Sequence, residues 1–190
     1  MLFDNNENLS EVFQTVVHEI HRAALDKKHP FRFMALATGS GHDLNNRYVV
    51  LRKIDQDLNL YVFTDSRTGK VKDLEKNPAC AILLYHPQKR AQVIIKGTVT
   101  LHNQDQVAQE YWSQVQGDAR KAYNPSVAPG TVINKPEDAH KWPASLDDTH
   151  FTVIKVEIGS IEALQLNGLE HLRAQFIRSN GDWDKNWIVP

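Results

Sequence analysis

The chain has 190 residues, with 22 Lys and Arg against 23 Asp and Glu and a net charge of −1. A chain of this length is expected to fold as a single domain, residues 1–190, and the absence of any run of like charge argues against a nucleic-acid partner. No stretch approaches the roughly 18 apolar residues of a membrane span. With a single cysteine and no signal-peptide pattern, we expect a cytoplasmic protein.

The N-terminal region is predicted to be an amphipathic helix over Ser10–Leu25. Asn8 and Glu11 have the spacing of a capping box, and apolar residues recur behind them at helical intervals. Alternating apolar residues then predict a first strand over Phe31–Thr38, and the sequence GSGHDLNN at 39–46 is interpreted as a loop.

Two short β-branched segments, Arg47–Leu51 and Leu60–Thr64, flank a polar turn and predict a hairpin. A helix is expected over Lys70–Lys76, because Asn77-Pro78 ends it. Two strands should follow, at Ala79–Tyr85 and Ala91–Leu101.

The second half of the chain continues with short helices and further strands. Helices are expected at Asp105–Gln116 and Asp118–Tyr123, and strands at Phe151–Ile158, Ile161–Leu166 and His171–Ile177. Four prolines make 124–148 an irregular, functional or mobile loop, and the Trp-bearing tail DWDKNWIVP receives no element. This order predicts an antiparallel barrel or closed sheet with peripheral helices. The chain lacks GxGxxG and GxxxxGK[ST], so neither a dinucleotide-binding fold nor a P-loop is supported.

The segment RYVVLR carries two arginines that need not serve one phosphate. In a flat strand Arg47 shares a face with Val49, whereas Arg52 shares the opposite face with Tyr48 and Val50. The arginines could therefore face different parts of a ligand, the strand could be bent, or both arginines could be edge charges on a solvated strand.

The turn from Thr64 to Lys70 gathers hydroxyls and cations at a helix start, where free N–H groups attract anions. It fits a phosphate site, but it fits equally an ordinary helix capped by Ser66 or Thr68, with its cations in solvent.

Other candidate groups carry less information. His18 and His21 miss the spacing of the HExxH zinc motif, so no metal site is expected. Cys80 lies in an apolar run and has the character of a buried, inert thiol. His171 and Arg173, two apart, could bind an anion together from one strand face, or form a surface pair.

Four segments in order carry a family resemblance: RYVVLR, VFTDSRTGK, LEKNPACAILLY and AQVIIKG. The chain resembles the FMN-binding split barrel of the pyridoxamine 5′-phosphate oxidase family, and the HLRAQF and DWDKNWIVP segments are similar to that family's closing segment. The resemblance implies a mainly β fold with peripheral helices, a six-stranded antiparallel split β-barrel. It also implies a homodimer with FMN bound at the subunit interface.

The resemblance further implies which residues form the site. The cofactor-binding residues would be Arg47, Tyr48, Val49, Val50, Arg52, Phe63, Thr64, Arg67, Thr68, Lys70 and Gln92. Arg67, Thr68 and Lys70 would hold the phosphate, and Gln92 would hydrogen-bond the pyrimidine edge of the ring. Residues that position the substrate would be Arg52, Tyr111, Arg120, His171 and Arg173.

The chain also departs from the family pattern. Thr68-Gly69-Lys70 stands where the oxidases have Ser-Arg-Lys, and Val115 and Ala119 replace the arginine and serine expected at the substrate phosphate. His171-x-Arg173 reverses the expected Arg-x-His. These departures argue against oxidation of pyridoxamine 5′-phosphate itself.

The resulting hypothesis is an FMN-dependent oxidoreductase that transfers a hydride from a small anionic substrate to flavin N5. One alternative is a non-catalytic flavin-binding or storage protein. A haem-handling split barrel is a third possibility, which would need a histidine ligand.

Overall fold

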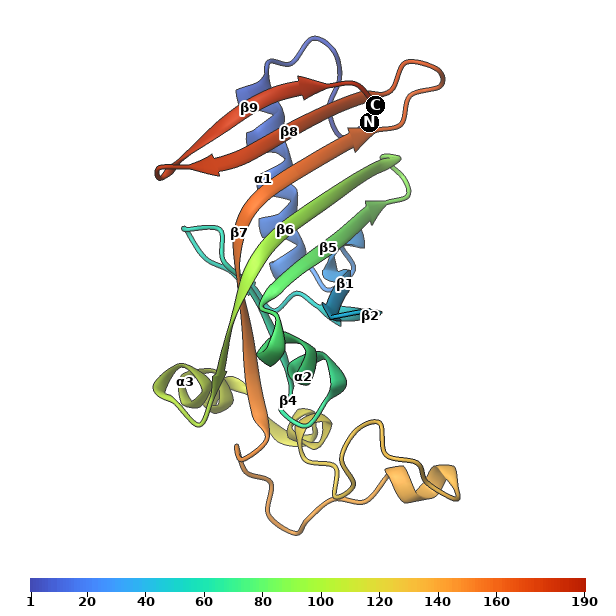
Figure 1. Ribbon diagram of the computed structural model, residues 1–190, viewed down its shortest axis with the longest axis vertical. Helices are drawn as coiled ribbons and strands as arrows, with labels where there is room; N and C mark the ends of the chain where they lie inside the picture. The colour runs from blue at the N-terminus through green and yellow to red at the C-terminus, as the bar shows by residue number, and fades with distance from the viewer.

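The computed structural model of the protein describes residues 1–190, apart from the side chain of Ser40. One antiparallel sheet forms its centre (Figure 1). The strands are β1 (Phe33–Ser40), β2 (Asp43–Val50), β3 (Lys53–Ile54), β4 (Leu60–Asp65), β5 (Ala79–His86), β6 (Ala91–Asn103), β7 (Phe151–Gln165), β8 (Leu172–Ser179) and β9 (Asp182–Ile188). The helices are α1 (Leu9–Leu25), α2 (Gly69–Lys76) and α3 (Gln106–Gln114), and the 3-10 turns are η1 (Pro30–Arg32), η2 (Gly117–Tyr123) and η3 (Pro136–Ala139).

The sheet closes into a barrel because β2 and β3 act as one bent strand. β1 pairs with β2 and β5, β5 with β6, β6 with β7, β7 with β4, and β4 with β3. Between β2 and β3, the Leu51 N–H donates to Arg32 O and the Arg52 N–H donates to Tyr61 O, both over 2.9 Å. This bent strand therefore lies between β1 and β4, and the ring has the six strands expected of a split barrel.

The remaining strands extend the sheet beyond the ring. β7 is long enough to pair with β4 through its first half and with β8 through its second half, and β9 pairs with β8. The β8–β9 hairpin lies at the end of the molecule where both termini meet, and the long 124–150 segment lies at the opposite end (Figure 1).

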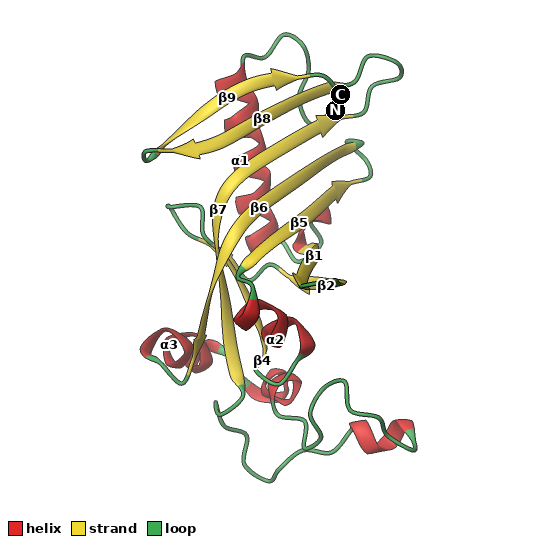
Figure 2. Cartoon of the chain, in the orientation of Figure 1, coloured by secondary structure: helices red, strands yellow, loops and turns green.

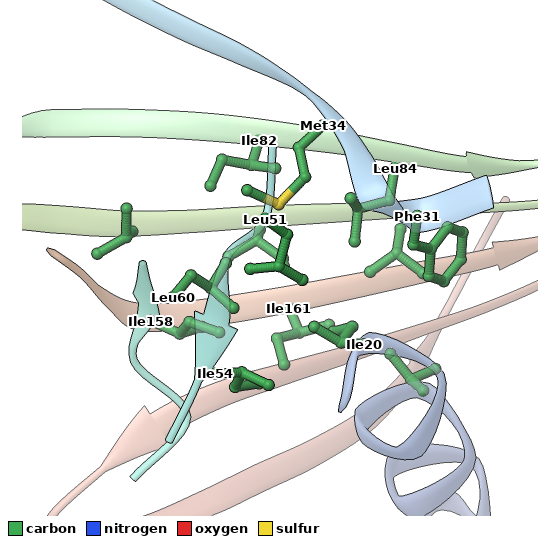
Figure 3. Close-up of a cluster of buried hydrophobic side chains, with 14 of the residues drawn as sticks. Ile20, Phe31, Met34, Leu51, Ile54, Leu60, Ile82, Leu84, Ile158 and Ile161 are labelled. Atoms are coloured by element: carbon green, nitrogen blue, oxygen red, sulfur yellow. The ribbon is translucent and has the colours of Figure 1, made fainter. Parts of the chain in front are cut away.

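The barrel interior is filled by alternate residues of the strands and by one face of α1. Met34, Leu51, Ile82 and Ile161 are almost fully buried, and Ile20 of α1 joins them (Figure 3). The helix starts at Leu9 because Asn8 and Glu11 form the expected capping box. Figure 2 shows α1 running behind β7, β8 and β9. The apolar stripe of α1 thus covers one side of the sheet.

A second hydrophobic core lies against the first residues of β7 and is covered by α3 and η2. Its buried members include Tyr61, Tyr111, Tyr123, Phe151 and Val153. The aromatic rings of this cluster lie edge-to-face or tilted, as in the pair of Tyr123 and Phe151, whose centroids are 5.0 Å apart. This core positions α3 and η2 beside β4.

The predictions for the barrel strands and for α1 and α2 are confirmed with small shifts at their ends, but the β1–β2 connection was predicted wrongly. Residues 39–46 are not a loop: Ser40 pairs with Asp43, and only Gly41 and His42 form the turn. Gly41 has φ 65°, which a glycine adopts without strain. The predicted hairpin is present, but its first strand is β3, whose Lys53 and Ile54 pair with β4, whereas the Arg47–Val50 part of the bent strand pairs with β1.

The C-terminal tail, which received no element from the sequence, forms β9. The sequence feature that indicates this strand is Asn180-Gly181. These residues form a two-residue hairpin turn, with φ values of 48° and 87°, that joins Ser179 to Asp182. The two strands expected at Phe151–Ile158 and Ile161–Leu166 are one strand, with a bulge opposite Lys96 and Gly97.

A buried ion-pair network fixes α1 to the β5–β6 turn. The Glu19 carboxylate accepts hydrogen bonds from Arg22 at 2.8 Å and His29 Nε2 at 3.2 Å, and Lys89 Nζ lies 2.8 Å away. Burial by itself raises the pKa of Glu19, but the Lys89 and Arg22 hydrogen bonds outweigh it and lower the pKa to about 2. Glu19 is therefore a carboxylate at any ordinary pH.

The same cluster has the residue types of a metal site, since ligand atoms of Glu19, His29 and His86 lie within 4.8 Å of one another. However, Nδ1 of His29 accepts the Phe31 N–H and Nδ1 of His86 accepts the Lys89 N–H. In the neutral rings the proton is then on Nε2, the nitrogen that faces Glu19. The group therefore fits hydrogen bonding to Glu19 better than metal ligation.

Among the described residues, no helix has both the length and the apolar character needed to cross a membrane.

Candidate functional site

The two arginines of the RYVVLR segment lie in different surroundings, as the strand geometry predicts. Val49 and Leu51 are buried in the barrel, whereas Tyr48 on the opposite face is 76% exposed. Arg47 reaches toward α2, and Arg52 reaches toward η2. Because Val49 is buried, only its backbone is available to a ligand.

A cluster of cations and hydroxyls lies where β4 meets the start of α2. Lys70 Nζ donates to Thr64 Oγ1 over 2.9 Å, and Thr68 Oγ1 lies 3.5 Å from the same hydroxyl. Thr68 is the N-cap residue of α2, and its side chain makes no capping hydrogen bond. The hydroxyls, the ammonium and the N–H groups of the first helical turn together have the chemistry of an anion site.

The charged form of Lys70 is disfavoured by its surroundings, and a bound anion would stabilise it. Burial lowers the pKa of Lys70, and the nearby Arg47 guanidinium lowers it further, only partly opposed by Asp65. A phosphate placed between two such cations would favour their charged forms. We refer to Arg47, Thr64, Thr68 and Lys70 as the α2 cation cluster.

Arg47 is held in this cluster by side chains from two other elements, β1 and α2. Its Nη1 donates to Thr38 Oγ1 over 2.6 Å, and its Nη2 lies 3.6 Å from Asp73 Oδ2 of α2. Thr38 and Asn45 also donate to that carboxylate oxygen. Asp73 therefore orients Arg47 and neutralises part of its charge.

Arg67, expected beside the phosphate, does not join the α2 cation cluster. Its guanidinium makes two hydrogen bonds to the buried Asp65 carboxylate, at 3.0 and 2.6 Å, and a third to Pro125 O at 2.8 Å. The Asp65 hydrogen bonds raise the pKa of Arg67. The structure thus places Arg67 as a link between β4 and the 124–150 segment.

A pocket of about 480 Å³ opens beside the other end of the RYVVLR segment. Arg52 and Lys53 line it together with Phe63, Tyr111 and Tyr123. Arg52 Nη2 lies 3.5 Å from the Tyr123 hydroxyl, and its guanidinium lies 5.8 Å from the centre of the Phe63 ring. We call this space the aromatic pocket.

The charges of the aromatic pocket interact with its phenols. Lys53 Nζ lies 5.3 Å from the centre of the Tyr111 ring, and hydrogen bonding to Tyr111 raises the pKa of Lys53. Burial raises the pKa of Tyr123, although Arg52 opposes this. Tyr123 is therefore neutral near neutral pH, and the pocket presents cations and phenolic hydroxyls.

The outward face of β1, β2, β5 and β6 carries exposed apolar side chains. Phe33, Tyr48, Leu83 and Tyr85 are all large and at least 40% exposed. Gln92 lies on this face, where it lines a shallow hollow of about 330 Å³ together with Asn46 of β2. Gln92 and Tyr48 thus share the face, three strands apart.

Three of the residues expected to position the substrate do not line the aromatic pocket. Arg173 Nε and Nη2 donate to Glu162 Oε1 at 3.0 and 2.7 Å, and His171 Nδ1 accepts the Asn167 N–H, both at the β8 end of the sheet. Arg120 donates to Val115 O over 2.8 Å, and its guanidinium lies 4.8 Å from the centre of the Trp112 ring. Within one chain, only Arg52 and Tyr111 of that set line the aromatic pocket.

Lys53, Tyr123 and Asp73 were not predicted as site residues from the sequence. Lys53 follows Arg52 directly, yet nothing in the sequence places it beside Tyr111. Asp73 lies in the first turns of a helix beside the predicted phosphate turn, and a carboxylate there carries no signal for an anion site.

Comparisons with known proteins place the chain in a family and match its fold. Residues 10–103 match the family model described as "Pyridoxamine 5'-phosphate oxidase, FMN-binding domain". The match includes the α2 cation cluster, Arg52 and Gln92, whereas Tyr111, Arg120, His171 and Arg173 lie beyond it.

One curated relative is the pyridoxine/pyridoxamine 5′-phosphate oxidase of Christiangramia forsetii. It is 32% identical over 85 residues, which cover 44% of this chain and 39% of that oxidase. The match therefore spans well under half of the oxidase's length.

Two solved structures share the fold across almost the whole chain. A pyridoxamine 5′-phosphate oxidase-related, FMN binding protein from Nostoc punctiforme matches with a TM-score of 0.77 and 23% identity, over 97% of this chain and 100% of that one. PhzG from Burkholderia lata, solved with tetrahydrophenazine-1-carboxylic acid, matches with a TM-score of 0.78 and 17% identity, over 100% of this chain and 98% of that one. Because residues 10–103 match the FMN-binding domain model of the family, on a split barrel that spans the chain, this protein belongs to the pyridoxamine 5′-phosphate oxidase family.

Proposed function

We propose that the protein binds FMN and acts as an FMN-dependent oxidoreductase on a small anionic substrate. The observation that carries the proposal is the α2 cation cluster, which lies inside the part of the chain that matches the FMN-binding domain. Lys70 is partly buried beside Arg47, and two threonine hydroxyls adjoin it at a helix N-terminus. These donors suit the terminal phosphate of FMN.

The assigned roles follow from where the side chains lie. Arg47, Thr64, Thr68 and Lys70 would hold the phosphate, and the backbone from Tyr48 to Val50 would run along the cofactor toward Arg52. Bound FMN would supply a hydride acceptor at N5. In the aromatic pocket, Arg52 and Tyr111 would hold the substrate's anionic group and fix its orientation.

We further propose a homodimer in which the exposed face of β1, β2, β5 and β6 is covered by a second copy. A contiguous group of large exposed apolar residues on one face is typical of an interface. Gln92 and Tyr48 would then lie at the subunit boundary near the cofactor. His171 and Arg173 would reach the site only from the partner subunit.

The decisive experiment is the absorption spectrum of the purified protein, with mass identification of any released ligand. Flavin bands and a mass equal to FMN are expected. A Soret band would support haem binding instead, and a colourless protein that takes up no added FMN would refute the proposal. The dimer is tested separately by sedimentation: Leu83→Lys should give a monomer, and a wild-type protein that is monomeric at micromolar concentration would refute it.

A non-catalytic flavin-binding protein is the second candidate. It is favoured by the apolar Val115 and Ala119 in the aromatic pocket and by the pairing of Arg173 with Glu162. Steady-state assays with amine, alcohol and reduced-nicotinamide donors separate the two candidates, since a storage protein would bind FMN without turnover.

A further inference from the structure

The aromatic pocket has features that narrow the class of its ligand. Its side chains come from three separate elements: Phe63 from β4, Tyr111 from α3 and Tyr123 from η2. A volume of about 480 Å³ lies within the range of small-molecule sites and accommodates a planar ring system of one or two rings. Aromatic walls favour such a ligand over a flexible polar one.

The arrangement of charge in the pocket favours an anion at Arg52. The charges of Glu110 and Asp55 act on Lys53 and, together with hydrogen bonding to Tyr111, raise its pKa. Neither Lys53 nor Arg52 makes an ion pair among the described residues, and the Arg52 side chain has only the long hydrogen bond to Tyr123. One exposed guanidinium therefore stands without a counter-ion at the rim of an aromatic pocket.

The donors near Arg52 suit a carboxylate better than a phosphate ester. A carboxylate accepts two parallel hydrogen bonds from one guanidinium, and the Tyr123 hydroxyl is a further neighbour. A phosphate group presents three oxygens and up to two charges, and it needs more donors. Val115 and Ala119, which line the same pocket, offer no side-chain donor, so the further donors in the lining are the Lys53 ammonium and the amides of Gln114 and Gln116.

From these features we propose that the aromatic pocket binds a planar aromatic monocarboxylate, with the carboxylate on Arg52 and the ring between Phe63, Tyr111 and Tyr123. This inference rests on the proposed function, because the ligand would be the substrate, or an analogue of it, in the flavin protein. It goes further by naming the substrate class and by excluding aromatic phosphate esters.

The test compares three probes by calorimetry on the FMN-loaded protein: 1-naphthoate, 1-naphthamide and 1-naphthyl phosphate. The carboxylate should bind at least about tenfold more tightly than the neutral amide and the phosphate ester, because a charge-assisted pair forms only with the carboxylate. Equal binding of amide and carboxylate would overturn the inference, and so would tighter binding of the phosphate ester.

The variant Arg52→Met assigns the effect to one side chain. It should weaken 1-naphthoate binding about tenfold and leave 1-naphthamide binding unchanged, which also shows that the pocket is intact. Arg178→Met is the matched control, since that exposed guanidinium only contacts Asp57 O at 3.3 Å, and it should change neither value. If Arg52→Met loses FMN, or if it leaves naphthoate binding unchanged, the inference is wrong. Failure of the proposed function would be visible separately, as a protein without flavin absorbance.

Discussion

Lys70 Nζ donates a hydrogen bond to Thr64 Oγ1 over 2.9 Å, and so joins the first turn of α2 to the end of β4. Burial and the neighbouring Arg47 lower the pKa of this lysine, so its charge costs the folded protein free energy. A side chain that is unfavourable for the fold but well placed for an anion has the character of a binding residue.

Replacing this lysine should therefore separate binding from stability. Lys70→Met should weaken FMN binding by at least about tenfold, because a charge-assisted hydrogen bond is lost. The same change should leave the Tm of the FMN-free protein equal or higher, because the folded-state pKa lies below that of the unfolded chain and the penalty of the charged form disappears. Titration with FMN by flavin fluorescence and thermal unfolding measure the two effects. Lys72→Met, on the exposed side of the same helix, is the control for both.

Arg67 should matter for stability and not for FMN. Arg67→Met leaves the buried carboxylate of Asp65 without its partner, which should lower the free energy of unfolding by about 3 kcal/mol. Urea denaturation measures this loss, and the double variant Asp65→Asn/Arg67→Met should recover part of it. FMN affinity should stay within about twofold of wild type. A tenfold loss of FMN affinity would instead show that Arg67 contributes to phosphate binding.

The Glu19 network predicts a specific acid sensitivity. The pKa of Glu19 is about 2 in the folded protein and 4.5 for the unperturbed group, so the stabilisation is fully present above pH 4.5 and is lost as the pH falls toward 2. Urea midpoints measured between pH 6 and pH 2.5 should fall over that interval. Glu19→Gln should be less stable at pH 6 and show a flatter profile. Parallel profiles for the two proteins would contradict the assignment.

The bulge between β6 and β7 gives a matched pair of glycine variants. A Cβ at Gly97 would overlap the backbone carbonyl oxygen of Glu157, whereas a Cβ at Gly159 would lie at an ordinary 3.7 Å from Lys96 O. Gly97→Ala should thus cost about 2 kcal/mol of unfolding free energy, as overpacking against backbone does, and Gly159→Ala should cost little. Urea denaturation compares them, and equal stabilities would show that the strands can separate at this point.

The elements with strong local signals were predictable from the sequence. Helix α1 has a capping box, and β5 and β6 alternate between buried and exposed residues. The β9 strand was missed because its inner face is only half-buried and carries Lys185 beside Trp183, so its sequence shows no apolar alternation, although Asn180-Gly181 marked the turn. Closure of the barrel depends on the backbone hydrogen bonds that Leu51 donates to Arg32 of η1 and Arg52 donates to Tyr61 of β4, which the apolar pattern of the segment does not encode.

The site was predictable as a set of residue types and less so as a set of contacts. Thr64, Thr68 and Lys70 come together because they lie within one turn of chain. Arg67 belongs to the same turn, but its position is decided by Asp65 and by Pro125 O, 58 residues further along the chain. A distant carbonyl group therefore redirects a cation that the local sequence assigns to the phosphate.

The bent strand between β1 and β4 also constrains how this site can change over evolution. Arg47 and Arg52 lie an odd number of positions apart in the sequence, so one points to α2 and the other to the aromatic pocket. Inserting or deleting a single residue between them would turn one arginine to the opposite face of the strand. It would also shift the backbone hydrogen bonds of Leu51 and Arg52 that close the barrel. The number of residues between Arg47 and Arg52 is therefore constrained. The residues around this hexapeptide can change, and with them the ligand that the pocket binds, without disturbing the direction of either arginine.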